Sequence, residues 1–429
     1  MIRKASLLII LVICCGAIQA SGVELTLDSC LARAERHYPL IRQYGLLDRT
    51  EALSLSDINK SWLPRLGLYG QATVQNSVPA LPEAFSDLMS LMGQAPRGLG
   101  KEQYKVGLDV SQTIWDGGES RHRRRTARAE TASRRAALDV ELYAVRSRVE
   151  TLYFGILLLD RQIEISKTTE TLLRSNLGRL NAMVANGTAM AADADMVEAQ
   201  LLANRQQTER AEASRQALRT MLAIFIGEEV ADTLAVPEAT MPSAVGSERP
   251  EERAFQARID LNRARLDAVD ASLMPRVGLF AQGYYGYPGL NYFESMMNRN
   301  LSFNIMAGVK VTWQIDAFYT RSNSRRRIAL ENASIEAERA TFRFNNSMEG
   351  ADKECRIEGM RRVMTSDARI VELRASVRRA AESQLREGVI DATALLTKIT
   401  DESQARLNAS YHEIELIQNI YNLKHILNR

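Results

Sequence analysis

The sequence predicts an α+β membrane protein in which long α-helical coiled-coil hairpins accompany four transmembrane β-strands per chain. Three observations predict this class. A segment near the start of the chain recurs 211 residues later, each copy opens a run of alternating apolar and polar residues, and each half then carries a very long stretch of helix-forming residues. The chain is therefore a duplication, and each half supplies two strands and one long hairpin.

The duplication is clearest around a shared Pro-Arg pair. Residues 63–71 read Leu-Pro-Arg-Leu-Gly-Leu-Tyr-Gly-Gln, and residues 274–282 read Met-Pro-Arg-Val-Gly-Leu-Phe-Ala-Gln. Later landmarks recur 201 residues apart, in the pairs Gly107 with Gly308 and Gly187 with Gly388. One loop of the second half is therefore about ten residues shorter than its counterpart in the first half.

The segments that follow alternate with a period of two residues, which is typical of a strand with one apolar and one wet face. Each run spans about 10–12 residues, the length of a tilted strand that crosses a bilayer. The apolar sides of the four runs hold Leu66, Leu68, Gly70, Ala72 and Val74; Tyr104, Val106, Leu108, Val110 and Ile114; Val277, Leu279, Ala281 and Tyr285; and Ile305, Ala307, Val309, Val311, Trp313 and Ile315.

Residues 1–22 are expected to be a secretory signal peptide. Two basic residues precede a largely apolar core of about eleven residues, which is too short for a spanning helix, and small residues offer a cleavage point before Val23. Lipidation at Cys14 or Cys15 stays an alternative, although the bulky Ile13 precedes Cys14 where a lipoprotein signal has a small residue.

Composition excludes few classes beyond these. The net charge of +3 gives no basic field for nucleic acid, and no later stretch reaches about 18 consecutive apolar residues, the minimum for a spanning helix. Cys30 and Cys355 remain after the signal peptide. Their spacing does not support a disulfide, and we expect two free thiols that act as small apolar residues.

The remaining elements follow one plan in each half. In the first half, helices over 25–60 lead into the first strand, a proline-containing loop lies over 76–102, and the second strand ends near Trp115. Proline-free, helix-forming stretches then predict a long helix over about 119–186, a break at Gly187 and a helix over about 192–226. The predicted division is a first repeat over 23–226, a linker over 227–249 and a second repeat over 250–429.

The long helices and the four strands together constrain the assembly. At about 1.5 Å per residue, the first long helix would be about 100 Å long and must pair with other helices as a coiled coil. Four strands cannot close a membrane sheet, because the smallest barrels have about eight and open edges are not tolerated in lipid. If the strands lie in a membrane, the chain must oligomerise; a dimer would give eight strands and a trimer twelve.

At this point the sequence resembles the TolC-like outer-membrane efflux protein family, over nearly all of the chain after the signal peptide. The resemblance rests on the duplicated order of elements and on several short motifs. These are Leu27-Asp28-Ser29-Cys30-Leu31 with Pro39, Leu63-Pro64-Arg65-Leu66-Gly67-Leu68, Val110-Ser111-Gln112-Thr113-Ile114-Trp115-Asp116-Gly117-Gly118, Tyr153-Phe154, and the breaks at Gly187 and Gly388.

The resemblance implies a homotrimer with a 12-stranded β-barrel among outer-membrane lipid and an α-helical tunnel in the periplasm. It implies a passive exit duct, without enzymatic activity or cofactors, for an inner-membrane transporter and a periplasmic adaptor (membrane fusion) protein. The resemblance also places adaptor docking at the two periplasmic tips, at Gly187, Thr188 and Ala189 and at Gly388, Val389 and Ile390.

The tips also suggest a gate. Some relatives carry acidic residues where Ala394 and Thr397 stand here, so an acidic ring from the second tip is in doubt. Asp193 and Asp195 of the first tip are the alternative candidates for a gate. The competing interpretation is that they are acids favoured by the dipole at the start of a helix, and both interpretations stay open.

Aromatic residues on or beside the strands predict belts at the membrane interfaces, the alternative being ordinary strand packing. The candidates are Tyr69, Tyr104, Trp115, Tyr285 and Trp313. The four histidines have no metal-ligand spacing, and no nucleophile or phosphate-loop motif is present in the sequence, so we expect no metal, cofactor or catalytic site.

Two functional hypotheses therefore stand. The favoured one is the passive outer-membrane duct, and the alternative is a periplasmic coiled-coil scaffold or adhesin without a pore. A pore-forming protein should require detergent and a scaffold should not. The sequence does not identify the cargo or the class of pump.

Overall fold

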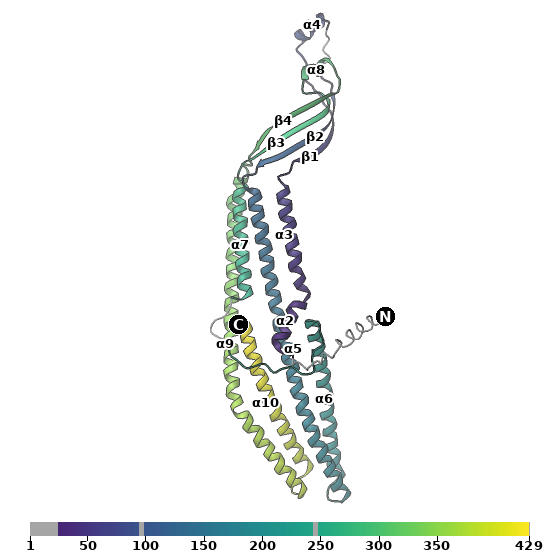
Figure 1. The fold of residues 1–429 in the computed structure, drawn as a ribbon, viewed down its shortest axis with the longest axis vertical. Coiled ribbons are helices and arrows are strands. Elements are labelled where there is room, and N and C mark those ends of the chain that lie inside the picture. Colours follow the sequence, from purple (N-terminus) through teal and green to yellow (C-terminus); the bar gives the residue numbers. More distant parts are fainter. Residues whose placement is uncertain (1–24, 94–97, 243–247, 429) are drawn as a thin grey trace, which may run out of the picture. The chain divides into compact units, whose positions relative to one another are not determined.

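The computed structural model describes residues 25–93, 98–242 and 248–428 (Figure 1). The expected signal peptide, with Cys14 and Cys15, lies outside these residues. Within the described ranges, no helix is both long enough and apolar enough to cross a membrane. The chain divides into two compact units. Of the described residues, one unit holds 43–93, 98–137 and 252–339, and the other holds 25–42, 138–242, 248–251 and 340–428. Each unit takes segments from both sequence repeats.

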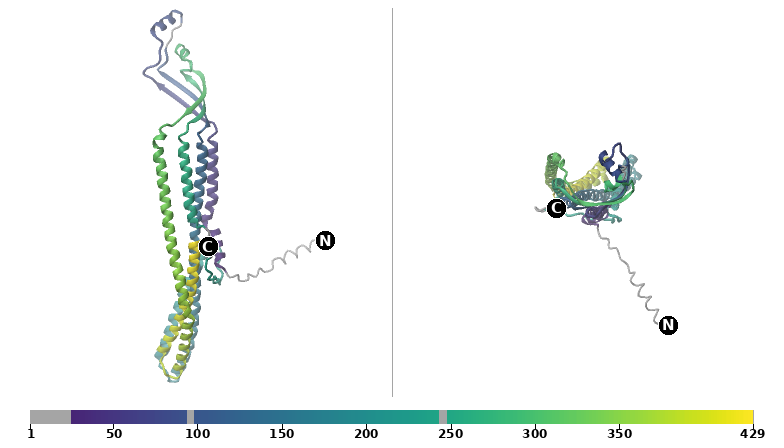
Figure 2. Two further views of the ribbon diagram at one scale, coloured as in Figure 1. Left: turned by 90° about the vertical axis from the view of Figure 1, so that its left-hand side faces the viewer. Right: turned by 90° about the horizontal axis from the view of Figure 1, so that it is seen from above.

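The first of these units contains the sheet. The short η1 (Pro39–Ile41) precedes α3 (Arg42–Lys60), which leads into β1 (Arg65–Val74); β2 (Glu102–Trp115) returns. In the second repeat α7 (Pro250–Ala271) leads into β3 (Arg276–Tyr287), and β4 (Ser302–Thr312) returns. The four strands form one antiparallel sheet in the order β1-β2-β3-β4 (Figures 1 and 2).

Two short helices occupy the connections at the far end of the strands. The helix α4 (Glu83–Leu91) lies between β1 and β2, and α8 (Tyr292–Met297) lies between β3 and β4. The sequence predicts a loop over 76–102 without a helix, and the structure contains α4 within that range. Both segments are bracketed by proline or glycine, which is why their short helical turns carried no clear periodic signal.

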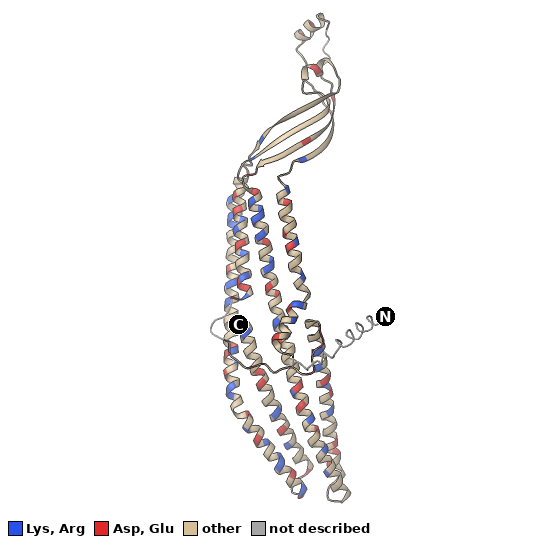
Figure 3. Ribbon diagram, viewed as in Figure 1, with Lys and Arg blue, Asp and Glu red and all other residues tan. Residues whose placement is uncertain are grey.

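The other unit consists mainly of paired helices. It holds α2 (Leu27–His37), α6 (Ala191–Ile226), α10 (Ala392–Leu427) and the distal parts of α5 (Glu119–Ala185) and α9 (Ala317–Arg386). The two long hairpins, α5 with α6 and α9 with α10, are the duplicated elements that the sequence predicts. Charged residues are distributed along all of these helices, whereas the sheet carries few (Figure 3).

The core of the helical unit is built around Tyr153 and Phe154, which are both fully buried. The hydroxyl of Tyr153 lies 2.7 Å from the carbonyl oxygen of Leu25 and 2.6 Å from that of Ala235, and so ties α5 to a parallel bridge between Leu25 and Leu234. The single hydroxyl proton of Tyr153 is shared between these two backbone acceptors, and the Leu25 carbonyl also accepts a 3.2 Å bond from the Ala235 amide.

The two cysteines among the described residues are free thiols, in agreement with the prediction from their spacing. Cys30 lies in the core of the helical unit, where burial raises the pKa of its thiol to about 11, and Cys355 is exposed on α9. A thiol with so high a pKa stays protonated and packs as a small apolar group.

Candidate functional site

One face of the sheet is apolar and exposed. The strand register aligns Leu66 with Val110, Leu68 with Leu108, and Leu279 with Val309, so the apolar sides of all four strands fall on the same face. The large apolar side chains exposed on that face are Leu66, Leu68, Val74, Tyr104, Val106, Leu108, Leu279, Tyr285, Phe303, Ile305, Val309 and Val311. Leu68 and Val74 are 81% and 82% exposed. A continuous apolar surface of this kind marks contact with lipid or with another protein.

The opposite face is polar and internally bonded. Gln282 on β3 donates a 2.8 Å hydrogen bond to the hydroxyl of Tyr69 on β1, across the intervening strand. The ammonium of Lys105 lies 5.2 Å from the centre of the Tyr284 ring, a cation–π distance. This face therefore has polar contacts of its own, whereas the apolar face requires an external apolar environment.

An aromatic ring lies across a glycine at the same place in each repeat. Tyr69 is paired with Gly107, and Phe280 with Gly308. A Cβ at Gly107 would lie 2.9 Å from the Tyr69 ring, and one at Gly308 would lie 3.0 Å from the Phe280 ring. The glycine leaves room for the ring to lie flat over the neighbouring strand, a known device for fixing the register of a sheet.

The five predicted interfacial aromatics fall into two groups. Tyr104 and Tyr285 are exposed on the apolar face near the loop ends of β2 and β3, and Trp115 and Trp313 are exposed where β2 and β4 meet the long helices. Tyr69 instead lies on the polar face, where it bonds Gln282. Only Tyr104, Tyr285, Trp115 and Trp313 are therefore placed to form an aromatic belt in contact with lipid.

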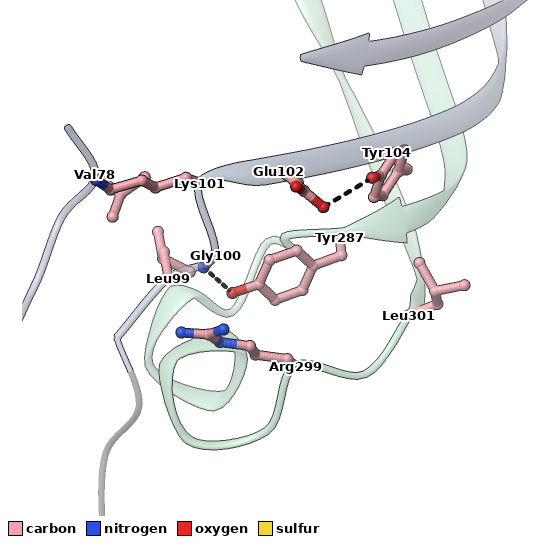
Figure 4. A pocket seen from close by; sticks show the side chains of 9 residues that line it. All are labelled: Val78, Leu99, Gly100, Lys101, Glu102, Tyr104, Tyr287, Arg299 and Leu301. Atoms are coloured by element: carbon pink, nitrogen blue, oxygen red, sulfur yellow. Dashed lines mark hydrogen bonds between the residues drawn. The ribbon is translucent and has the colours of Figure 1, made fainter. Parts of the chain in front are cut away.

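The loop ends of the strands enclose a pocket of about 610 Å³ (Figure 4). The phenol of Tyr287 accepts a 2.6 Å hydrogen bond from the Gly100 amide and donates to the carbonyl of Ser295, which joins the two loops. Leu99 and Met296 are buried beside it. The two loops are thus packed against each other.

The two hairpin tips have the same backbone structure. Gly187 and Gly388 both have positive φ, of 71° and 70°. At the first tip the amide of Gly187 bonds the Val184 carbonyl at 3.0 Å, and the amide of Thr188 bonds the Met183 carbonyl at 2.8 Å. At the second tip the corresponding distances, from Gly388 to Leu385 and from Val389 to Gln384, are 3.1 and 2.9 Å. Both are Schellman terminations, which require glycine at the left-handed position.

Acidic residues at the tips accept hydrogen bonds from backbone amides at the starts of α6 and α10. At the first tip the Asp193 carboxylate accepts a 3.2 Å bond from the Met190 amide. At the second, Asp391 is itself the N-cap and accepts a 2.8 Å bond from the Ala394 amide. Asp195 is exposed and has no hydrogen bond or ion pair with any described residue. The hydrogen bond of Asp193 agrees with its interpretation as an acid that stabilises the start of α6. Asp195 is the carboxylate of this tip that forms no such bond with a described residue.

The two tips pack against each other through a shared apolar cluster. Leu180 and Val197 of the first hairpin lie in the same cluster as Leu385 and Leu395 of the second, and Ala189 and Ile390 pack against it from the turns. Met190 and Val389 point outward and are 76% and 69% exposed. Ala189 and Ile390 therefore have a packing role, and the accessible tip surface is provided by the neighbouring residues.

Above the tips, Glu402 is the centre of an ion-pair network between α9 and α10. Its buried carboxylate bonds Arg378 and, at 2.7 Å, Arg406. Arg378 also bonds Glu382 at 2.7 Å. Although burial alone would raise the pKa of Glu402, hydrogen bonds from Arg378 and Arg406 lower it, so the carboxylate stays charged.

A second buried carboxylate has no such partner. Glu150 on α5 is 5% exposed, and its Oε2 atom has no hydrogen-bond partner among the described residues. It lines a pocket of about 200 Å³ with Asp28, Arg146 and His425. The Tyr143 hydroxyl donates to the backbone carbonyl of His425, and the two rings stack with centres 4.2 Å apart. No sequence motif indicates this group, because its members lie on three helices that are distant in the chain.

Comparison with known proteins agrees with these features. A family model described as "Outer membrane efflux protein" matches residues 58–228. No curated protein matches the chain. Among solved structures, the outer-membrane channel OprN has a TM-score of 0.69 at 16% identity, with 94% of this chain and 89% of that chain covered.

Two further channels give similar values. The outer membrane protein VceC from Vibrio cholerae has a TM-score of 0.65 at 14% identity, with 94% and 96% of the two chains covered. The open-state MtrE outer membrane channel of Neisseria gonorrhoeae has a TM-score of 0.67 at 16% identity, with 94% and 88% covered. At these identities the likeness to solved structures establishes the fold.

The sheet with one apolar face and the duplicated hairpins give the chain the fold of these outer-membrane channels. Residues 58–228, which hold the first pair of strands and the first long hairpin, are in addition similar to the outer membrane efflux protein family.

Proposed function

We propose that the chain forms a passive homotrimeric duct that carries solutes across the outer membrane for an inner-membrane transporter, to which a periplasmic adaptor connects it. The observation that carries the proposal is the exposed apolar face of the four-stranded sheet. In lipid, the unpaired outer edges of β1 and β4 must be satisfied by other copies of the chain, because backbone groups without partners are costly there. Three copies give twelve strands.

In this arrangement the apolar face contacts lipid and the polar face lines the duct. Tyr104 and Tyr285 at one end of the strands, and Trp115 and Trp313 at the other, would form the two aromatic belts. The chain would supply the path, and the energy for transport would come from the inner membrane.

The hairpin tips are the proposed docking surface for the adaptor. Thr188 and Val389 are exposed, and the neighbouring glycines at 187 and 388 keep the backbone accessible to a partner helix. Ala189 and Ile390 would hold the two turns together beneath that surface. Because the Asp193 carboxylate is hydrogen-bonded at the start of α6, Asp195 would be the main acidic residue of a gate.

The experiment is single-channel conductance of detergent-purified protein in planar bilayers, with two arginine variants of β1. Leu68→Arg places a charge on the apolar face, where it costs about 2–4 kcal/mol in lipid, and should prevent insertion. Gln71→Arg, the matched control on the polar face, should insert and conduct. Protein that is soluble without detergent and gives no current would instead support the scaffold hypothesis. Equal behaviour of the two variants would contradict the assignment of the faces.

A further inference from the structure

A groove rich in cationic side chains lies on the polar face of the sheet, at the end that joins the long helices. Its volume is about 240 Å³, and Arg65, Arg276 and Lys310 line it from three different strands. The register places these residues in adjacent rows: Arg65 pairs with Ser111, Lys310 with Gly278, and Arg276 with Thr312. Arg276 and Lys310 lie on the adjacent strands β3 and β4, and Arg65 lies on β1 at the other edge of the sheet, so the three charges share one face of the sheet.

Two of these three charges have no counter-ion. Arg276 forms a 2.7 Å ion pair with Glu119 at the start of α5. Arg65 and Lys310 are exposed and make no ion pair or hydrogen bond with any described residue. Asp109 is the acidic residue that the strands place on the polar face, and it lies one row away from Arg65. The positive charge of the groove is thus largely uncompensated.

The polar part of the remaining lining suits an anionic solute, and Leu63, Val277, Leu279 and Phe280 supply the apolar part. Ser111, Thr113 and Thr312 offer hydroxyl donors beside the two free cations. Gly278 lies between them without a side chain, and a Cβ there would meet the Gln112 carbonyl oxygen at 2.9 Å. Hydroxyl donors that converge with guanidinium and ammonium groups are the usual means of binding carboxylate and phosphate.

We infer that this groove is a selectivity site for anions in the membrane part of the duct, and that it favours cargo bearing carboxylate or phosphate groups. The inference rests on the proposed function, because the polar face is a pore lining only in the closed oligomer. Three copies would place six unpaired cations at one level of the pore. A ring of arginine and lysine side chains selects anions, and a narrow low-dielectric wall strengthens the effect.

The test is the reversal potential across a planar bilayer with a KCl gradient, measured on the full-length trimer. Wild-type protein should prefer chloride, Arg65→Gln/Lys310→Gln should lose most of that preference, and Arg65→Glu/Lys310→Glu should prefer potassium. Lys101→Gln, which removes an exposed cation from the loop end of the sheet, should leave the reversal potential unchanged.

Salt concentration gives a second measure. The screening length is about 8 Å at 0.15 M and about 3 Å at 1 M, so the preference for chloride should decline steeply between these concentrations. Inorganic phosphate added in place of chloride should reduce the single-channel current of the wild type more than that of Lys310→Gln, a single change at an exposed site that should not affect assembly.

The outcomes separate the inference from the proposed function. Conducting channels whose reversal potential is the same in the wild type and in the double glutamate variant would overturn the selectivity site and leave the duct intact. Wild-type protein without any conductance would overturn the duct itself.

Discussion

Replacing Glu150 by glutamine should stabilise the protein at alkaline pH and leave its stability at pH 4 nearly unchanged. Burial raises the pKa of the Glu150 carboxyl to about 7; Arg146 opposes the shift and Asp28 adds to it. In the same pocket, burial lowers the pKa of His425 to about 4, with a further contribution from Arg249. The two shifts have opposite consequences for stability.

The sign for each group follows from which state holds the proton. Between pH 4.5 and 7, Glu150 is protonated in the folded protein and ionised in the unfolded chain, so stability falls as pH rises. Between pH 4 and 6.5, His425 is neutral in the folded protein and protonated in the unfolded chain, so stability rises with pH. At about 1.4 kcal/mol per pH unit, each group contributes about 3 kcal/mol over its window.

In the wild-type protein these two contributions nearly cancel where the windows overlap. In Glu150→Gln only the His425 contribution remains, so the free energy of unfolding should rise with pH between pH 4 and 6.5. The variant should be about 3 kcal/mol more stable than wild type at pH 8. His425→Phe, which keeps a ring to stack on Tyr143, should expose the falling contribution of Glu150 and be more stable than wild type at pH 4. The double variant should show the weakest dependence on pH from this pocket.

The assay is thermal unfolding followed by circular dichroism in detergent, at half-unit steps from pH 4 to 8 and at one fixed protein concentration, because oligomer stability depends on concentration. Glu198→Gln, the same substitution at an exposed position of α6, serves as the control. Parallel curves for wild type and Glu150→Gln would refute the reasoning, since they would mean that Glu150 titrates alike in both states.

Two further predictions concern the hairpin tips. A photo-crosslinking amino acid at Val389 in the native host should capture a periplasmic adaptor, identified by mass spectrometry, whereas one at the exposed Val363 on α9 should not; capture at both positions would argue against docking at the tip. Asp195→Ala should raise single-channel current if its free carboxylate narrows the entrance. Asp193→Ala should mainly weaken the start of α6, by about 0.3–1 kcal/mol, and an equal rise in current from both changes would contradict the division of roles.

Much of the fold could be predicted from the sequence, because the two relevant signals are local and repeated. The two-residue alternation between Arg65 and Val74 fixes which side chains share a face, and the second copy repeats it. The long helix predicted over about 119–186 is observed as Glu119–Ala185, since its ends carry a turn and a glycine that stop any helix.

The site was less accessible to sequence reasoning, because its parts meet only in the folded chain. From the sequence alone, Glu150 would be expected on a solvated face of the helix. Only the packing of α2 and α10 against α5 shows that it is buried and that its Oε2 atom has no hydrogen-bond partner among the described residues. Asp193 was assigned alternative roles because a carboxylate near a turn suits both a gate and a helix start, and the bond to Met190 depends on the turn geometry. Arg65 and Lys310 are too distant in sequence to suggest one groove.

The rings of Tyr69 and Phe280 have a consequence for the bore of the proposed duct. A large aromatic residue on the inner wall of a narrow tube would ordinarily project toward the axis and obstruct it. Here each ring lies over the glycine of the adjacent strand, so its bulk adds thickness along the wall instead. A larger residue at Gly308 would meet the Phe280 ring and push it toward the axis, which would narrow the passage without adding a charge. At Gly107 a larger residue would also meet the Gly283 carbonyl and the Tyr284 side chain on the other neighbouring strand.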